Sequence, residues 1–278
     1  MIHKIGLGSV QFGLPYGISN LEGQTSIEEV SKILDIAHGN GISIIDTASG
    51  YGTAEKVIGL TNNNRFSVVS KFMPSNSAMD IRSQLENSIT LLNADHLYAY
   101  LAHRPLDLLA NPHVWEELQN IKSDNKVKKI GFSLNSPDEC FKLLNAGMKP
   151  DVVQVPFNYF DTRFSDVLKK LKGEGCEVHT RSAFLQGLFF SDTQKLSPFF
   201  DEMKPMLNYL HKTYSDELEG VLLGYVLQQE FIDFVIIGVE NSTQLTKNLQ
   251  SIACAPELEP LKFAYSDKLL MPMHWPKN

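Results

Sequence analysis

SIEEVSKILDIAHGNGISIID, residues 26–46, contains a helical pattern followed directly by a strand pattern. Val30, Ile33 and Ala37 recur at the spacing of one helical face, and glycines follow them. After the glycines, a short run rich in isoleucine ends in Asp46. The segment therefore predicts an amphipathic helix leading into a buried strand, which is the repeating unit of an α/β fold.

The same unit recurs along the whole chain. Apolar runs typical of strands occupy residues 4–8, 42–46, 66–71, 97–103, 128–133, 151–157, 176–181 and 234–238. Eight strands that alternate with helices predict a parallel sheet with right-handed crossovers, and the number eight favours closure into a barrel. Since no linker or composition break interrupts the chain, we predict a single (β/α)8 TIM barrel over residues 1–278.

The interval between the last two predicted strands is the longest of the series. It runs from Arg181 to Gly238 and contains an aromatic stretch, QGLFFSDTQKLSPFF, and two helical patterns, near 199–213 and 216–229. One helix is enough for a crossover between parallel strands. The sequence therefore predicts an extra helix in a long loop over the barrel mouth.

Bulk composition narrows the class of function. The 278 residues carry a formal net charge of −7 without a cluster of Lys or Arg, which disfavours nucleic-acid binding. Cys140, Cys176 and Cys254 are far apart and include no C-x-x-C pair, so neither a disulfide framework nor a metal site is predicted. The N-terminus lacks the apolar stretch of a signal peptide, and no segment is long enough to span a membrane. We expect a soluble, cytoplasmic protein, and the pattern specifies no oligomeric state.

Polar residues stand at the ends of strand runs that are otherwise apolar. They are Asp46, Lys71, His103, Ser133 and Arg181, with Gln154 inside its own run. Singly, each has an ordinary structural explanation: Asp46 as a helix N-cap, Lys71 as a solvated strand end, His103 as a turn residue. In an α/β barrel, however, the C-terminal strand ends converge on one rim, where active sites lie. Together the residues favour a site in which Asp46 and Lys71 meet from adjacent strands.

The residue types of this set indicate acid–base chemistry. Tyr51 follows Asp46 in DTASGYG, whose glycines allow a tight turn that brings the phenol over the rim. A phenol alone is a poor base at neutral pH, but a neighbouring ammonium favours the phenolate, and a carboxylate holds that ammonium in place. We therefore predict that Tyr51 is the acid/base and that Lys71 tunes it. Asp46 would anchor Lys71, and His103 would orient the substrate oxygen. The set includes no hydrolase-type nucleophile and no metal-ligand cluster, and it suits a reaction in which a cofactor delivers hydride.

These residues lie in motifs that resemble the aldo-keto reductases over nearly the whole chain. The motifs are GLGSVQFG (6–13), DTASGYG (46–52), VVSK (68–71), YLAHRP (100–105), IGFS (130–133), VVQVPFN (152–158) and VIIGVENSTQLTKN (235–248). The resemblance implies a barrel enzyme that reduces an aldehyde or ketone to an alcohol, with NAD(P)H bound across the barrel mouth. It also implies a Tyr proton donor, supported by Lys and Asp, and a His that positions the carbonyl. The matching residues are Tyr51, Lys71, Asp46 and His103.

The resemblance assigns cofactor contacts as well. Ser133 and Gln154 would hold the carboxamide, and Asp46 would lie near the nicotinamide ribose. Arg181 stands where the family usually stacks an aromatic ring on the nicotinamide, and a planar guanidinium can stack similarly. Further along the cofactor, the resemblance assigns Ser182, Leu185 and Gly187 to the pyrophosphate loop and Asn248 to adenine.

The segment that matches the adenosine end of the cofactor is poor in cations. It offers Gly238, Glu240 and Gln244, with Lys247 as its one cation. By resemblance, members that prefer NADP place basic residues around the 2′-phosphate. Glu240 can instead accept hydrogen bonds from a free ribose diol and repel a phosphate, whereas Lys247 is the residue able to restore phosphate binding. We expect NADP or NAD as cofactor, with a weakened preference for NADP.

The sequence indicates little about the substrate beyond a small-molecule carbonyl compound. A pocket of polar and aromatic residues would suit a sugar or a small aldehyde or ketone. The candidate aromatic residues are Phe12, Tyr16, Phe72, Phe157 and those within 189–200.

Two other functions are compatible with the same barrel. One is an isomerase or lyase in which Tyr51 and Lys71 move protons without net redox chemistry. The other is a regulatory barrel that binds cofactor as a sensor. The intact acid–base set argues against the sensor, because binding alone needs no acid.

Overall fold

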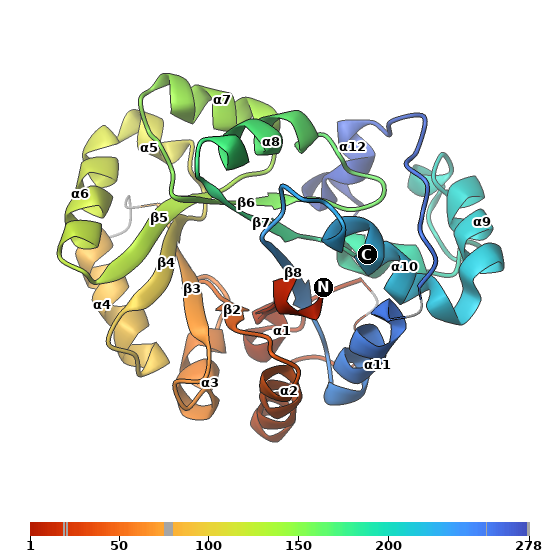
Figure 1. Ribbon diagram of the computed structural model, residues 1–278, viewed down its shortest axis with the longest axis horizontal. Helices are drawn as coiled ribbons and strands as arrows, with labels where there is room; N and C mark the ends of the chain where they lie inside the picture. The colour runs from red at the N-terminus through yellow and green to blue at the C-terminus, as the bar shows by residue number, and fades with distance from the viewer. Residues whose placement is uncertain (19, 21, 75–79, 254, 277–278) are drawn as a thin grey trace.

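The computed structural model describes residues 1–18, 20, 22–74, 80–253 and 255–276, in which eight strands form a closed parallel barrel (Figure 1). The strands are β1 (Ile5–Gly8), β2 (Ile44–Asp46), β3 (Ser67–Phe72), β4 (Leu97–Ala102), β5 (Val127–Ser133), β6 (Val152–Pro156), β7 (Glu177–Arg181) and β8 (Phe234–Gly238). They pair in sequence order, and β1 pairs with β8 to close the barrel. Each strand overlaps a run predicted from the sequence, so the (β/α)8 barrel is confirmed.

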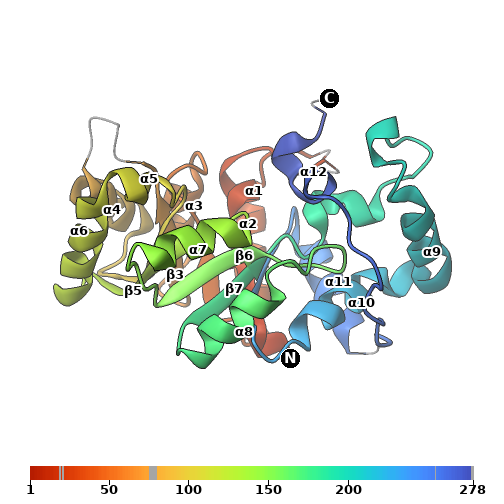
Figure 2. The same ribbon diagram turned by 90° about the horizontal axis from the view of Figure 1, so that it is seen from above.

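Helices surround the barrel and connect its strands (Figure 1). The α-helices are α1 (Val10–Gly13), α2 (Ile27–Gly39), α3 (Ala54–Thr61), α4 (Ile81–Leu92), α5 (Asp107–Ala110), α6 (Pro112–Ser123), α7 (Pro137–Asn145), α8 (Ser165–Gly173), α9 (Lys204–Tyr214), α10 (Leu218–Leu227), α11 (Ser242–Ile252) and α12 (Asp267–Leu270). Short 3₁₀ helices are η1 (Ile2–Lys4), η2 (Leu185–Phe190), η3 (Pro198–Phe200), η4 (Ser215–Glu217) and η5 (Pro272–His274). Figure 2 shows the N-terminus and α12 at opposite ends of the barrel.

The ends of α2 follow from its own sequence. Ser26 accepts a hydrogen bond from the Glu29 amide at 3.3 Å and so caps the first turn. Val30 and Ile33 lie on its buried face. Gly41, just after the helix, has φ of 77°, a left-handed conformation that favours glycine. The local signals therefore place this helix before β2, as predicted.

The barrel interior forms an apolar cluster separate from the layer between strands and helices. Its buried members are Ile44, Val69, Ala99, Leu101, Val152 and Ile236. Because side chains alternate along a strand, Lys71 points the same way as Val69, and Asp46 the same way as Ile44. Ile42 precedes β2 and packs in the outer cluster, so the inward column below Asp46 begins at Ile44 and does not include Ile42.

The connection between β7 and β8 contains two α-helices. α10 is buried along most of its length and packs against β8 and α11, as a crossover helix does. α9 buries only Leu207 and Leu210 and lies farther from the barrel than α10 (Figures 1 and 2). The predicted extra helix in this interval is therefore confirmed.

Two cysteines lie in the described part of the chain, and both are free and buried. Burial raises the pKa of the Cys140 thiol to about 11 and that of Cys176 to about 12, so both are protonated at neutral pH. Cys254 lies outside the described residues. Among the residues described, no three His, Cys, Asp or Glu side chains are grouped to hold a metal ion, and no helix has the length and apolarity needed to cross a membrane.

Candidate active site

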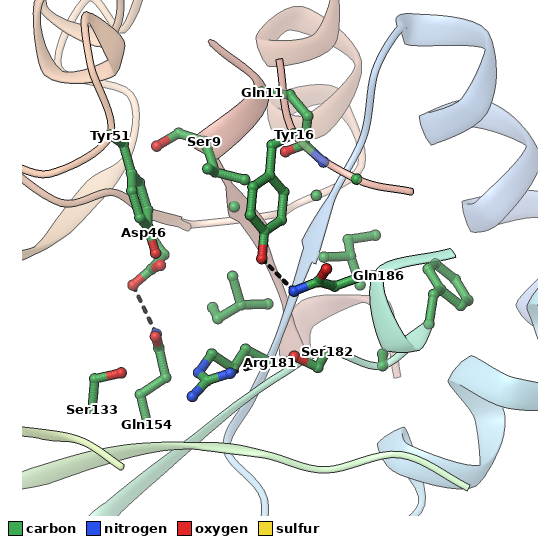
Figure 3. Close-up of a pocket in the computed structure, with 18 of the residues that line it drawn as sticks. Ser9, Gln11, Tyr16, Asp46, Tyr51, Ser133, Gln154, Arg181, Ser182 and Gln186 are labelled. Atoms are coloured by element: carbon green, nitrogen blue, oxygen red, sulfur yellow. Dashed lines mark hydrogen bonds between the residues drawn. The ribbon is translucent and has the colours of Figure 1, made fainter. Parts of the chain in front are cut away.

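A cavity of about 560 Å³ opens at the C-terminal ends of the strands (Figure 3). Residues from almost every part of the rim line it, among them Ser9, Asp46, His103, Ser133 and Gln154. This is the end of an α/β barrel at which enzymes of this fold place their chemistry. The polar strand ends found in the sequence therefore meet around one cavity.

A buried ion pair joins β2 and β3 at this cavity. Lys71 is fully buried, and its Nζ lies 2.5 Å from Asp46 Oδ1. The same ammonium donates to the Thr47 carbonyl at 2.9 Å, and Gln154 Nε2 donates to Asp46 Oδ2 at 2.8 Å (Figure 3). Taking a charge out of water is costly, so each partner depends on the opposite charge and on these hydrogen bonds. The predicted contact between Asp46 and Lys71 is present.

Tyr51 is held near this pair by a tight turn. Its amide donates to the Ala48 carbonyl at 3.0 Å, and Gly52, next in the chain, has φ of 57°. Gly13 of α1 packs so closely that a Cβ there would lie 1.8 Å from the Tyr51 carbonyl oxygen. The Lys71 ammonium lies 5.2 Å from the centroid of the Tyr51 ring. A cation at this position can stabilise negative charge on the phenol.

His103, directly after β4, packs edge-on against the Tyr51 ring, with 5.6 Å between ring centroids and an interplanar angle of 83°. Its pKa is lowered to about 3, chiefly by burial and further by the positive charges of Lys71, Arg181 and Arg104. The imidazole is therefore neutral at physiological pH and carries one N–H that can donate. Its Nδ1 has no hydrogen-bond partner among the described residues.

Ser133 and Gln154 are register partners on β5 and β6. Gln154 is only 1% exposed, and its amide nitrogen is committed to Asp46. Its Oε1 has no partner in the part of the chain that the structure describes. Leaving a buried polar atom unpaired costs about 1–3 kcal/mol. Because Gln154 lines the cavity, this oxygen is suited to a ligand that brings a donor.

The segment after β7 folds beside the cavity with an unusual backbone. Ser182, Leu185 and Gln186 have positive φ values of 64°, 46° and 53°. Gln186 Nε2 donates to the Tyr16 hydroxyl at 2.7 Å, which links this segment to the loop after α1 (Figure 3). The Ala183 amide donates to no described residue. Free amides in such a turn form a concavity that suits an anion.

The far end of the cavity, at the start of α11, is acidic. Glu240 and Gln244 line it, and the Glu240 amide donates to Gln244 Oε1 at 2.7 Å. Glu29 of α2 accepts from the Ser242 amide and hydroxyl at 2.7 and 2.6 Å, and these hydrogen bonds lower the pKa of Glu29 to about 2. Lys247 pairs with a carboxylate of α10 at 2.6 Å and does not line the cavity.

The structure brings most of the predicted cofactor residues to the cavity. Its lining includes Asp46, Ser133, Gln154, Arg181, Ser182, Gly187, Gly238, Glu240 and Gln244. Leu185 and Asn248 are buried and do not line it. Leu185 belongs to the outer core, and Gln186, after it in the chain, lines the cavity instead. Lys71 is also absent from the lining, because it lies buried behind Asp46.

The aromatic candidates divide between cavity and core. Tyr16 and Phe190 line the cavity. Phe12, Phe72 and Phe157 are buried in the outer cluster, so the prediction that they form the pocket is wrong. For Phe72 the period of two gives the reason, because it follows the inward-pointing Lys71.

Sequence reasoning also missed several lining residues. The polar ones include Ser9, Gln11, Arg104, Asn135 and Gln186. Two carried a usable signal: Arg104 directly follows His103 at the end of a strand, and Asn135 lies two positions after Ser133. Asn135 Oδ1 accepts from Arg181 Nη2 at 2.7 Å, a contact that no local pattern predicts.

Fold and cavity together define an α/β-barrel enzyme, since the polar groups converge where such barrels carry out chemistry. Residues 4–270 match the family model of the aldo/keto reductases. The chain therefore belongs to this family, whose members are NAD(P)-dependent oxidoreductases.

Individual relatives are distant in sequence but similar over most of their length. The chain is 23% identical over 280 residues to the aldo-keto reductase YhdN of Bacillus subtilis (strain 168), covering 87% of this chain and 82% of that protein. The holo form of the aldo-keto reductase AKR11C1 from Bacillus halodurans is 17% identical, with a TM-score of 0.67 and coverage of 93% and 88%. An aldo/keto reductase from Klebsiella pneumoniae, solved in complex with NADP and acetate, is 20% identical, with a TM-score of 0.67 and coverage of 94% and 93%. These structures share the barrel fold with this chain.

Proposed function

We propose that this protein reduces an aldehyde or ketone to an alcohol, with a reduced nicotinamide cofactor as hydride donor and Tyr51 as proton donor. The observation that carries the proposal is the buried Lys71–Asp46 pair with its ammonium 5.2 Å from the Tyr51 ring. A buried ion pair is weak evidence for stability alone, but beside a phenol it has a chemical use. It offers a fixed positive charge where a phenolate would form.

In the proposed reaction the Tyr51 phenol gives its proton to the carbonyl oxygen as the carbonyl carbon receives hydride. The phenolate that remains is stabilised by the Lys71 ammonium, and Asp46 keeps that ammonium in place. Proton transfer from a positioned side chain contributes about 10²–10⁴-fold to rate. The neutral His103 donates a hydrogen bond to the same oxygen and so orients the carbonyl between the phenol and the hydride donor.

The residues around the cavity fit a nicotinamide cofactor, which when bound supplies the hydride. The unpaired Oε1 of Gln154 can accept from the carboxamide NH₂, and the hydroxyl of Ser133, its register partner, can donate to the carboxamide oxygen. The Arg181 guanidinium, fixed by Asn135, offers a plane for the nicotinamide ring. In the turn at 182–187 the Ala183 amide, which donates to no described residue, can donate to the pyrophosphate.

We further propose that the preference for NADP is weakened and that NADH is used well. Glu240 lines the adenosine end, and Glu29, whose pKa is lowered to about 2 by its bonds to Ser242, is ionised at the first residue of α11. Burial, and secondarily the negative charge of Glu22, raise the pKa of Glu240. A 2′-phosphate adds up to two more negative charges. Lys247, the cation of this segment, is engaged with a carboxylate.

Titration of the purified protein with NADH and with NADPH, followed by protein fluorescence, tests the cofactor step. Tyr51→Phe tests the chemistry. This variant should bind cofactor as the wild type does and lose about 10²–10⁴-fold in kcat on a panel of small aldehydes. Tyr209→Phe, an exposed tyrosine of α9, is the matched control and should keep full turnover.

The same experiments distinguish the proposed reductase from the alternative functions. Unchanged turnover in Tyr51→Phe would remove the phenol from the mechanism. Binding of neither cofactor would reject hydride transfer and point to an isomerase or lyase. Cofactor binding without turnover of any carbonyl compound would point to a sensor.

A further inference from the structure

Two guanidinium groups at the cavity have no carboxylate partner among the described residues. The chain has five arginines, and three of them, Arg65, Arg82 and Arg163, form ion pairs with carboxylates. The remaining two are Arg104 and Arg181, and both line the cavity. None of the residues outside the described part is Asp or Glu, so every acidic side chain is accounted for.

Arg181 is held by neutral groups alone. Its Nη2 donates to the Leu134 carbonyl at 3.1 Å and to Asn135 Oδ1 at 2.7 Å, and Nη1 donates to Ser182 Oγ at 3.4 Å. These bonds fix the guanidinium without neutralising it. Arg104 directly follows His103 in the chain and also lines the cavity. Its side chain makes no hydrogen bond or ion pair with any described residue.

The other charges of the cavity do not offset these two cations. Asp46 is already neutralised by Lys71. Glu240 lies at the opposite end, beside α11. The charges of Arg104 and Arg181 both help to lower the pKa of His103, which places them within electrostatic reach of that imidazole. The catalytic end of the cavity therefore carries an excess of positive charge, in a chain whose net charge is −7.

The two arginines lie on different parts of the rim. Arg181 ends β7 and adjoins the turn proposed for the pyrophosphate, so the cofactor offers it a partner. Arg104 follows β4, which lies between β3 with Lys71 and β5 with Ser133, and no cofactor contact proposed above is assigned to it. The next residue, Pro105, restricts the Arg104 backbone, and the Asp107 amide donates to the Arg104 carbonyl at 3.3 Å. The backbone of Arg104 is therefore held at the rim, while its exposed guanidinium has no ion-pair partner among the described residues and no proposed cofactor contact.

We infer that the substrate is a carbonyl compound that carries an anionic oxygen group, a carboxylate or a phosphate, and that Arg104 binds this group. The inference rests on the proposed reductase function and adds the substrate class to it. A guanidinium donates two parallel hydrogen bonds to either kind of group, and the exposed Arg104 side chain at the cavity rim can turn toward it. Binding the remote anion would also orient the carbonyl toward Tyr51.

Paired substrates test the inference. 4-Oxobutanoate is compared with butanal, and glyceraldehyde 3-phosphate with glyceraldehyde, each with saturating reduced cofactor. The wild type should show a higher kcat/KM for the anionic member of at least one pair. The pair that shows this preference identifies the bound group as a carboxylate or a phosphate. In Arg104→Met this ratio should fall about 10- to 100-fold, the effect of losing one or two hydrogen bonds to a charged group. Arg104→Lys should retain part of it, and added salt should reduce it.

Lys56→Met is the matched control, because it removes an exposed cation of α3 that does not line the cavity. It should leave the ratio unchanged. A wild type without preference in either pair, or an Arg104→Met variant that keeps the preference, would overturn the inference.

If the protein is not a reductase, no member of either pair is reduced, and this outcome differs from reduction without a preference for the anion. Calorimetric binding of the same four compounds to the wild type and to Arg104→Met then decides the anion site independently. Tighter binding of the anionic member, lost in the variant, supports the site, and equal binding overturns it.

Discussion

Replacement of Lys71 by Met leaves Asp46 as a buried carboxylate with no cation beside it. The native Nζ–Oδ1 distance is 2.5 Å, Lys71 is fully buried and Asp46 is 4% exposed. Removing one partner of such a pair costs about 3–5 kcal/mol, because the remaining charge keeps its desolvation penalty. The Thr47 carbonyl loses a donor as well. Against a total stability of about 5–15 kcal/mol, Lys71→Met should lower the free energy of unfolding measurably and reduce kcat by about 10²–10⁴-fold.

Urea unfolding followed by circular dichroism at pH 7 measures the first effect, and cofactor oxidation measures the second. The double variant Lys71→Met/Asp46→Asn separates charge from shape, because it removes both charges and keeps an acceptor for Gln154. It should be more stable than the single variant, with a coupling energy of about 0.5–3 kcal/mol. A loss below about 1 kcal/mol in Lys71→Met, or a double variant less stable than the single one, would refute the argument from the buried charge.

Two further predictions concern Glu240 and His103. Glu240→Gln should raise the affinity for NADPH relative to NADH several-fold, because it removes a like charge near the 2′-phosphate; fluorescence titration measures the ratio, and an unchanged ratio would exclude Glu240 from cofactor selection. The pKa of His103 is lowered to about 3 from an unfolded value of about 6.5, so the stability that its neutral form contributes is complete above about pH 6.5 and is lost as the pH falls toward 3. The wild type should therefore lose stability faster than His103→Gln in urea titrations between pH 6.5 and 4, and parallel curves would contradict the buried neutral imidazole.

Much of this fold could be predicted because its signals are local. The helical face from Val30 to Ala37 and the strand run before Asp46 are each short patterns with a fixed period. Eight such units commonly close into a barrel in which consecutive strands are neighbours. The C-terminal ends of the strands therefore follow one another around the rim in sequence order. For that reason strand-end residues as far apart as Asp46 and His103 could be placed at one cavity before any contact was known.

The side-chain directions in loops could not be predicted in this way. Leu185 faces the core and Gln186 lines the cavity, with positive φ at both residues, and no period describes such a turn. Phe12 packs in the outer cluster from α1, a helix of four residues that is too short to show a helical period in the sequence. Where the backbone is irregular, residue type alone does not predict whether a side chain points to the core or to a cavity.

The sequence by itself determined the barrel and the order of its strands, and it predicted that Tyr51, Lys71, Asp46 and His103 meet at one rim, because these depend on local periodicity and on strand order. Only the tertiary structure decided which charges are neutralised. Glu29 meets Ser242 across 213 positions of the chain, and Arg104 has no carboxylate partner in the part of the chain that the structure describes. Ion pairing depends on distances of a few ångströms between remote segments, and an amino-acid sequence contains no direct record of those distances.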